Sequence, residues 1–440
     1  MLGLYLHVPF CSAICNYCNF NRGLFDADLK ARYVDALLTE IAGPSSIPES
    51  SGPDAAHTES PVVLVRSGRS AIAQSAIKQS SIPESSIAES SISNKSAINK
   101  SAIANQSAIR NPQSALDCDS LYFGGGTPSL LEPSEIARLI GACREAFNVA
   151  DDVEITMEAN PETVTVERLA GFREAGVNRL SFGVQSFRDE ELRRLSRLHD
   201  ADRARGAIAE ARAAGFDNVS LDLMMWLPEQ RVGDWLESVD AAIAARPDHM
   251  SLYLLEVYPN APLRDEMARS RWSQAPDEDA ETMYLTAMER LEHSGLDQYE
   301  ISNVSRAGRR ARHNLKYWTD GEWIGFGCGA HSTRRGVRWK NVSGTEDYVQ
   351  RIGAGVSTKV DVRRLSPEER LGDALFTGLR LTDGIDLRAI ADRYGIDVWR
   401  RYGAELTRFV DAGWLVHDED CLKLTRRGML LAHEVMTVFV

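Results

Sequence analysis

The chain has 440 residues, 43% of them hydrophobic, and a formal net charge of -13. This leaves room for two or three domains of a soluble globular protein and excludes a general electrostatic attraction to nucleic acid. The first ten residues lack a basic region before their apolar run, and no apolar stretch is long enough to span a bilayer, so we expect neither a secretory signal nor a membrane span. Seven cysteines, three of them clustered, suit a reducing cytoplasm better than a disulfide framework.

The first predicted strand, residues 3–8, leads into Cys11, Cys15 and Cys18, spaced C-x3-C-x2-C. Thiolates at this density bind a soft metal. A zinc site prefers four closed ligands, and only His7 is a nearby fourth candidate. A [4Fe-4S] cluster on three cysteines keeps one open iron, where a cofactor can bind. The spacing resembles that of the radical S-adenosylmethionine (SAM) superfamily, so we predict a [4Fe-4S] cluster with SAM on its open iron, with zinc as the alternative.

A helix is predicted over residues 27–41, and the composition then changes sharply. Residues 43–117 are rich in Ser, Ala, Ile, Gln and Asn and carry a drifting five-residue repeat, such as Ser70-Ala-Ile72 and Ser75-Ala-Ile77. We favour a disordered low-complexity insertion, because the register slips and aromatic residues are absent. The alternative is a small pentapeptide-type β-solenoid with each isoleucine pointing inward.

Strands and helices alternate after this insertion. The predicted strands are 120–123, 152–157, 179–182, 218–224 and 250–255, and the predicted helices between them are 133–147, 166–175, 201–214 and 232–245. Such alternation predicts a parallel sheet with right-handed crossovers. We therefore predict an α/β fold, a partial (β/α)6 radical SAM barrel formed by residues 1–42 and 118–262, with its chemistry at the carboxyl ends of the strands.

The pattern is less regular beyond residue 262. We assign 263–364 to a barrel extension and connecting region, with a helix over 277–293. Residues 365–440 form a compact C-terminal, mainly helical unit, with helices near 367–379, 387–394 and 398–412, a hairpin of 415–417 and 421–424, and a last helix from Arg426. Helices followed by a hairpin resemble a winged-helix-like domain.

Polar and glycine residues gather at the predicted strand ends. Glycines after a strand let the backbone approach a ligand closely. They occur in Gly124-Gly-Gly126-Thr127, and the other strand ends carry Glu158, Gln185, Arg197 and Asp222. Together these groups predict one pocket able to hold a carboxylate, a ribose and an amino group.

Several longer motifs resemble the oxygen-independent coproporphyrinogen III oxidase family: Tyr5-x-His7-x-Pro9-Phe10-Cys11, the Gly-Gly-Gly-Thr-Pro-Ser run and Glu158-Ala-Asn-Pro. Others are similar to its heme chaperone branch, the HemW type: residues 176–187, Tyr299-Glu-Ile-Ser-Asn303 and Arg312-His-Asn-Leu-Lys-Tyr-Trp318. The resemblance implies cluster ligands Cys11, Cys15 and Cys18. It implies SAM contacts from Tyr5, Tyr17, Gly125, Gly126, Thr127, Glu158, Gln185, Arg197 and Asp222.

The sequence departs from the family pattern at four points, and the first two bear on function. The decarboxylating branch has a fourth cysteine two positions after the third and a longer N-terminal segment, whereas here Phe20 takes that position and the segment is absent. Both favour a chaperone that binds heme or a related tetrapyrrole and transfers it to acceptor proteins, such as respiratory ones, with peripheral membrane association through them. The alternative is coproporphyrinogen III oxidase (dehydrogenase) activity, so enzymatic activity stays open. Trp226 replaces a usual glycine, and Cys328 a usual proline.

A heme site is predicted near His313-Asn314-Leu-Lys-Tyr317-Trp318, which follows an arginine-rich loop. Arginines can pair with heme propionates, Tyr317 and Trp318 can stack on the macrocycle, and His313 can ligate the iron. The alternative is that His313 and Asn314 satisfy local backbone groups while the two aromatic residues pack between the barrel and the C-terminal unit. His331 is a second candidate ligand.

Overall fold

The computed structural model describes residues 1–43 and 116–440. The predicted low-complexity insertion lies almost entirely outside the described residues, so both expectations for it stay predictions.

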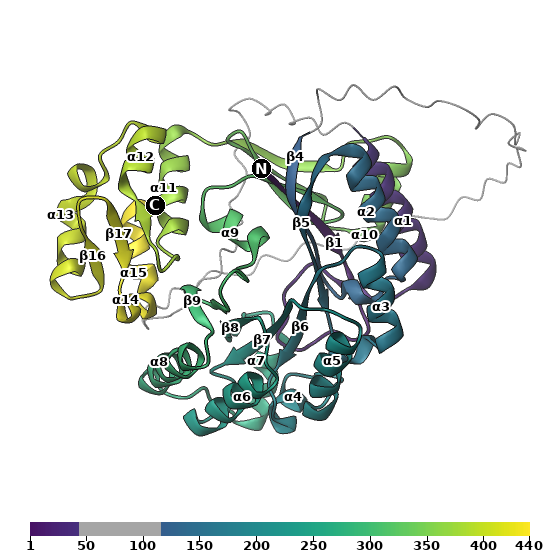
Figure 1. The fold of residues 1–440 in the computed structure, drawn as a ribbon, viewed down its shortest axis with the longest axis horizontal. Coiled ribbons are helices and arrows are strands. Elements are labelled where there is room, and N and C mark those ends of the chain that lie inside the picture. Colours follow the sequence, from purple (N-terminus) through teal and green to yellow (C-terminus); the bar gives the residue numbers. More distant parts are fainter. Residues whose placement is uncertain (44–115) are drawn as a thin grey trace, which may run out of the picture.

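A curved sheet organises the fold, with helices on its outer face (Figure 1). Its centre is a run of parallel strands in the order β1-β4-β5-β6-β7-β8. These strands are Leu2–Val8, Asp117–Gly125, Asn148–Ala159, Arg179–Gln185, Val219–Met225 and His249–Leu254. The crossover helices are α1 (Ala27–Ala42), α2 (Pro133–Ala146), α3 (Val166–Glu174), α4 (Asp189–Arg194), α5 (Ala201–Ala213) and α6 (Val232–Ala244). The predicted partial (β/α)6 barrel is confirmed, and its strands extend up to a few residues beyond the predicted bounds.

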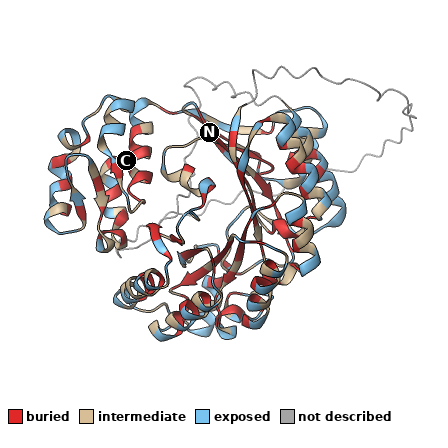
Figure 2. Ribbon diagram, in the orientation of Figure 1, coloured by how far each residue is buried: buried red, intermediate tan, exposed pale blue. Residues whose placement is uncertain are grey.

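Alternation along the strands separates an apolar outer face from a polar inner one. In β6, Leu180, Phe182 and Val184 belong to the hydrophobic core beneath the helices. Figure 2 shows the central strands as largely buried and the surrounding helices as partly exposed. Successive side chains of a strand point to opposite faces, so Arg179, Ser181, Gly183 and Gln185 line the barrel interior. This inward row carries the candidate site.

The sheet continues beyond the barrel on both sides. β11 (Trp323–Phe326) pairs parallel with β1, and the antiparallel strands β12 (His331–Arg334), β13 (Val337–Asn341) and β14 (Lys359–Arg364) follow it. At the other edge β10 (Asn303–Ser305) pairs antiparallel with β8, and β9 (Asp297–Glu300) pairs antiparallel with β10. The region predicted as an extension thus adds strands to the same sheet. Its helices are α7 (Pro262–Ser270), α8 (Asp277–His293), α9 (Arg312–Trp318) and α10 (Thr345–Gly353).

The C-terminal unit has its own core, which includes Leu371, Leu375 and Leu406. Its elements are α11 (Pro367–Gly378), β15 (Ile385–Asp386), α12 (Leu387–Tyr394), α13 (Val398–Asp411), β16 (Leu415–His417), β17 (Cys421–Leu424), α14 (Arg426–Leu430) and α15 (Ala432–Met436). The predicted hairpin gains β15 as a third strand, and the predicted last helix is divided into two short ones.

Helix α9 lies between the barrel and the C-terminal unit (Figure 1). The Glu154 carboxylate on β5 accepts the backbone N–H groups of Arg312 at 2.9 Å and His313 at 3.1 Å, which holds the first turn of α9 against the barrel. On the other side, Arg380 stacks over the Trp318 ring at 4.3 Å and pairs with the buried Glu300 at 2.9 Å. These contacts connect the barrel to the C-terminal unit.

Candidate functional site

The cysteine loop is anchored at both of its ends. Strand β2 (Phe10–Cys11) pairs with β3 (Gly23–Leu24), so the segment carrying Cys15 and Cys18 folds back on itself. Within it, the Asn16 amide donates to the Arg194 carbonyl at 2.8 Å and to the Glu266 carboxylate at 2.7 Å. The loop is therefore held against the ends of α4 and α7.

The three thiols share a largely water-excluded environment. Burial raises the pKa of Cys11 and of Cys18, and neighbouring cysteines raise it further. Arg197 Nη1 lies 3.4 Å from Cys15 Sγ. Among residues 1–43 and 116–440, no three His, Cys, Asp or Glu side chains are arranged around the position of a single metal ion. A cubane differs from a single ion because each thiolate binds a different iron, so three thiols on one loop fit it as a donor set.

His7 is not placed as a fourth ligand of a zinc site. Its Nε2 donates to the Asn21 carbonyl at 2.7 Å, so its Nδ1 accepts the Tyr5 hydroxyl at 3.0 Å. Burial lowers its pKa to about 4. Both ring nitrogens of His7 are therefore engaged within the barrel.

The glycine turn after β4 lies directly against the cysteine strand. Gly125 has a φ of +116°, and Gly126 N–H donates to the Val8 carbonyl at 2.7 Å. A Cβ on Gly126 would lie 2.6 Å from the Phe10 carbonyl oxygen, so only glycine fits there. The Thr127 hydroxyl hydrogen-bonds the Cys11 thiol. The predicted cluster loop and the predicted SAM turn thus meet.

Two predicted SAM-binding carboxyl groups face the barrel interior. Glu158 accepts the Tyr122 hydroxyl at 2.8 Å and the Gly125 N–H at 3.0 Å. Asp222 accepts the Ser181 hydroxyl at 3.2 Å. Burial raises the pKa of Glu158 to about 7 and that of Asp222 to about 6, and the nearby charge of Asp222 also raises the pKa of Glu158. A cationic ligand such as an amino group would relieve this cost.

Polar atoms without partners also line this region. Arg197 Nη2 donates to the Asn160 side chain and to the Gly183 carbonyl, both at 2.7 Å, yet its buried Nε has no partner within residues 1–43 and 116–440. The buried Gln185 Oε1 has none in this part of the chain either. Gln185 also adopts a φ of 69°, a left-handed conformation that costs a non-glycine residue about 1–3 kcal/mol. Buried groups left unsatisfied in this way fit a site that a polar ligand completes.

Of the two predicted tyrosines, Tyr5 lies on β1 and Tyr17 lies within the cysteine loop. Tyr5 stacks on Tyr122 with ring centroids 6.1 Å apart. Tyr17 packs against a small apolar cluster that includes Leu195 and Met224, and its hydroxyl hydrogen-bonds Cys15. The fold therefore brings all the predicted cluster and SAM residues to the carboxyl ends of the strands or the barrel interior next to them.

The two unusual residues noted in the sequence have clear local roles. Trp226 has a φ of 63°, and its indole N–H donates to the Ala275 carbonyl at 2.7 Å. The Cys328 N–H donates to the Tyr33 hydroxyl at 3.1 Å, a bond that proline could not make.

The predicted heme ligand His313 is 1% exposed. Its Nδ1 lies 3.0 Å from the Ser120 hydroxyl and its Nε2 3.0 Å from the Tyr317 hydroxyl, and burial lowers its pKa to about 3. Asn314 is half-buried, and Trp318 packs beneath Arg380. This arrangement favours packing between barrel and C-terminal unit, although His313 bonds side chains rather than the backbone groups expected.

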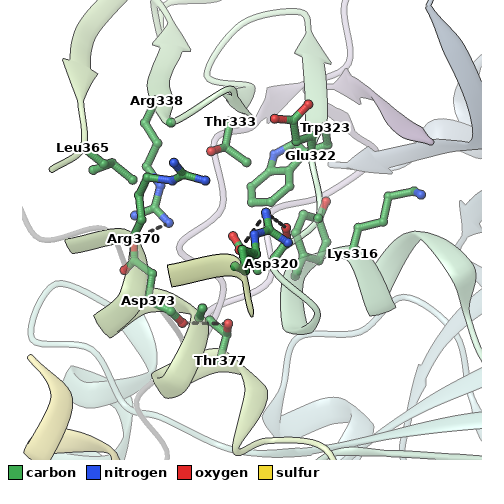
Figure 3. Close-up of a pocket in the computed structure, with 15 residues that line it drawn as sticks. Lys316, Asp320, Glu322, Trp323, Thr333, Arg338, Leu365, Arg370, Asp373 and Thr377 are labelled. Carbon is green, nitrogen blue, oxygen red and sulfur yellow. Dashed lines mark hydrogen bonds and ion pairs between the residues drawn. The ribbon is translucent and has the colours of Figure 1, made fainter. Parts of the chain in front are cut away.

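A pocket that sequence reasoning missed lies where β11–β13 face α11 (Figure 3). Its lining includes Lys316, Tyr317, Asp320, Trp323, Thr333, Arg338, Arg370, Asp373 and Thr377. Arg338 pairs with Asp373 at 2.8 Å. No local sequence pattern points to this pocket, because its residues come from separate segments of the chain.

The described helices of residues 1–43 and 116–440 include none with both the length and the apolar character to cross a membrane. All seven cysteines lie in these residues and are free thiols.

Comparison with known proteins agrees with this architecture. The pattern of the radical SAM superfamily matches residues 109–242, and that of the HemN C-terminal domain matches residues 365–431. A heme chaperone HemW from Bacillus subtilis is 30% identical over 441 residues, covering 100% of this chain and 99% of the relative. The chain belongs to the HemW family. A HemW from Mycobacterium tuberculosis is 32% identical over 438 residues, and the match covers 99% of this chain and 93% of the relative.

The fold of this HemW family member is also that of a solved radical SAM enzyme. Coproporphyrinogen III oxidase (HemN) from Escherichia coli superimposes with a TM-score of 0.74 at 21% identity, covering 100% of this chain and 89% of the enzyme. The radical SAM fold with a HemN-type C-terminal domain is thus confirmed.

Proposed function

We propose that this chain is a heme chaperone that carries a [4Fe-4S] cluster, binds SAM and transfers heme to acceptor proteins. The observation that carries the choice between chaperone and decarboxylase is Phe20. It is 66% exposed beside the cysteine loop, at the position where the decarboxylating branch has its fourth cysteine. The names of the full-length relatives support the same choice.

In this proposal Cys11, Cys15 and Cys18 hold the cluster. Glu158 accepts the amino group of SAM, Arg197 its carboxylate, and Gln185 and Asp222 its ribose, with the glycine turn and the two tyrosines around them. When bound, the cluster and SAM would supply one-electron chemistry. The residues themselves orient the ligand and limit the access of water, because Glu158 and Asp222 are partly buried and face the barrel interior.

Binding of heme through His313, Asn314, Tyr317 and Trp318 stays a prediction. For this, His313 Nε2 would have to give up its hydrogen bond with the Tyr317 hydroxyl in order to bind the iron. A heme titration of the His313→Ala variant tests it, and an unchanged affinity and Soret band would remove His313 from the heme site. We further propose that the chain works in the cytoplasm, with respiratory haem proteins among its acceptors.

The test is anaerobic reconstitution of the cluster, followed by two assays on the same preparation. Heme is titrated by absorbance in the Soret region, and coproporphyrinogen III is incubated with SAM and a reductant while its decarboxylated products are measured. Stoichiometric heme binding without decarboxylation is the expected result. Decarboxylation with turnover would instead favour the oxidase alternative.

A further inference from the structure

One face of the added sheet carries a row of groups that the proposed SAM site does not use. Trp323 pairs with Thr333, Thr333 with Arg338, and His331 with Lys340. Paired residues in neighbouring strands point to the same face, as do residues two apart in one strand. Trp323, His331, Thr333, Arg338 and Lys340 therefore share one face, and we call it the β11–β13 face.

The C-terminal unit supplies the opposite wall. Arg370 on α11 lines the same pocket as Trp323, Thr333 and Arg338 (Figure 3). Whereas Arg338 pairs with Asp373, the Arg370 guanidinium pairs with no carboxylate within the described residues and only lies 5.9 Å from the Tyr394 ring centroid. A pocket with one unpaired guanidinium beside a paired one suits a ligand that brings its own carboxylates.

The aromatic side of the pocket is preorganised. Tyr317 and Trp323 form an edge-to-face pair with ring centroids 4.6 Å apart, and both line the pocket. The two rings are therefore held in fixed positions and give the pocket an aromatic edge that a flat apolar ligand can contact.

His331 lies next to this pocket on the same face. His331 and Thr333 are two residues apart in β12, so His331 lies about 7 Å from the part of the pocket wall that Thr333 forms. Its side chain is exposed and makes no hydrogen bond within the described residues. Partial burial lowers its pKa, and the nearby Lys340 and Arg338 lower it further, whereas Asp361 opposes this. The imidazole is thus kept in the neutral form that ligates a metal.

We propose that the β11–β13 face is a heme-docking surface. His331 ligates the iron, Trp323 and Tyr317 contact the macrocycle, and Arg338 and Arg370 bind the two propionates. The heme would then lie between the barrel and the C-terminal unit, with His313 behind Tyr317 as a supporting residue. This inference rests on the proposed function, because it names where and how the heme is held.

The first test is a heme titration of the full-length chain and its His331→Ala variant. Loss of the iron ligand is expected to weaken binding about tenfold or more and to shift the Soret maximum. His293→Ala, which changes an exposed histidine on α8 away from this face, is the matched control and should bind as the wild type does. Because His331 is exposed, its removal should leave the melting temperature unchanged.

The second test separates propionate recognition from general stability. Arg370→Gln should weaken heme binding about tenfold, since a charge-assisted hydrogen bond is lost. It should leave binding of heme dimethyl ester, which lacks the carboxylates, at the wild-type level. Arg388→Gln, which removes an exposed arginine paired with Asp420, is the control.

The outcomes distinguish this inference from the proposed function. If the wild type binds no heme, both are wrong. If the wild type binds heme while His331→Ala and Arg370→Gln bind it with unchanged affinity and spectrum, the docking surface is wrong and the chaperone proposal stands.

Discussion

Glu158 and Asp222 show what burial does to single residues at the centre of this site. Their carboxyl groups lie within the barrel and near each other, and the hydrogen bonds to Tyr122, Gly125 and Ser181 only partly offset the loss of water. Without a ligand, Glu158 is therefore expected to be partly protonated near neutral pH, whereas Asp222 takes up a proton only as the pH falls to about 6. A bound cation would lower the pKa of both carboxyl groups and favour their charged forms.

The pH dependence of stability should report Glu158. Because its pKa in the folded chain is raised to about 7, its contribution to stability is fully present below the unfolded value of about 4.3 and is lost as pH rises through about 7. We expect Glu158→Gln to gain up to about 3 kcal/mol relative to the wild type between about pH 5 and 8. Denaturant unfolding of the ligand-free chain at both pH values measures this, with the exposed Glu174→Gln as control. Parallel pH profiles for wild type and Glu158→Gln would contradict it.

The proposed cluster should depend on each thiol of the cysteine loop. The reconstituted wild type should hold about four irons per chain, and Cys15→Ala should lose them together with the broad visible absorption. Cys421→Ala, in the C-terminal hairpin, should keep both. Iron analysis and absorbance check this. Equal loss on changing Cys118, Cys143, Cys328 or Cys421 would rule out a three-cysteine site.

Helix α9 illustrates how an element is held by a distant one. It has seven residues, too few for a stable isolated helix. Its N-terminal N–H groups are accepted by Glu154, which lies 158 residues earlier in the chain on β5. The position of His313, Tyr317 and Trp318 therefore depends on the barrel.

Removing the carboxylate at Glu154 should loosen α9. We expect Glu154→Ala to cost about 1–2 kcal/mol, as loss of a helix cap does, and Glu154→Gln to cost less because its amide oxygen can still accept. Chemical denaturation gives the free energies, and hydrogen exchange of residues 312–318 shows whether the loss is local. Wild-type exchange in Glu154→Ala would show that the cap is dispensable.

The crossover that joins strands β1 and β4 contains a long inserted segment. Strands β1 and β4 are parallel neighbours joined through α1, and residues 44–115 enter between Ala42 at the end of α1 and Asp117 at the start of β4. Such helix-to-strand connections usually need only about 2–6 residues. The crossover is thus complete without the addition.

Deletion of residues 46–113, with a short Gly/Ser link in their place, tests the low-complexity prediction. The melting temperature and the iron content should stay close to those of the full chain, because the deleted repeat offers little core beyond isolated isoleucines. Differential scanning calorimetry and iron analysis provide the comparison. A fall of many degrees would favour the β-solenoid alternative.

The sequence by itself determined the alternation of strands and helices, the cysteine loop and the polar groups at the strand ends. These depend on local periodicity and short spacing, which neighbouring residues encode. It also predicted Cys11, Cys15 and Cys18 as the ligands of a cluster, because three thiols on one short loop lie near each other.

Only the tertiary structure decided the rest. The parallel pairing of β11 with β1 joins residues over 300 positions apart, and no local pattern specifies it. The sequence predicts His313 as a metal ligand, but the fold places the hydroxyl groups of Ser120 and Tyr317 next to its two ring nitrogens. The pocket of Trp323, Arg338 and Arg370 exists only where the added strands meet α11. These three features, the strand pairing, the partners of His313 and the pocket, depend on packing between distant segments, which buries some polar groups and leaves others unpaired.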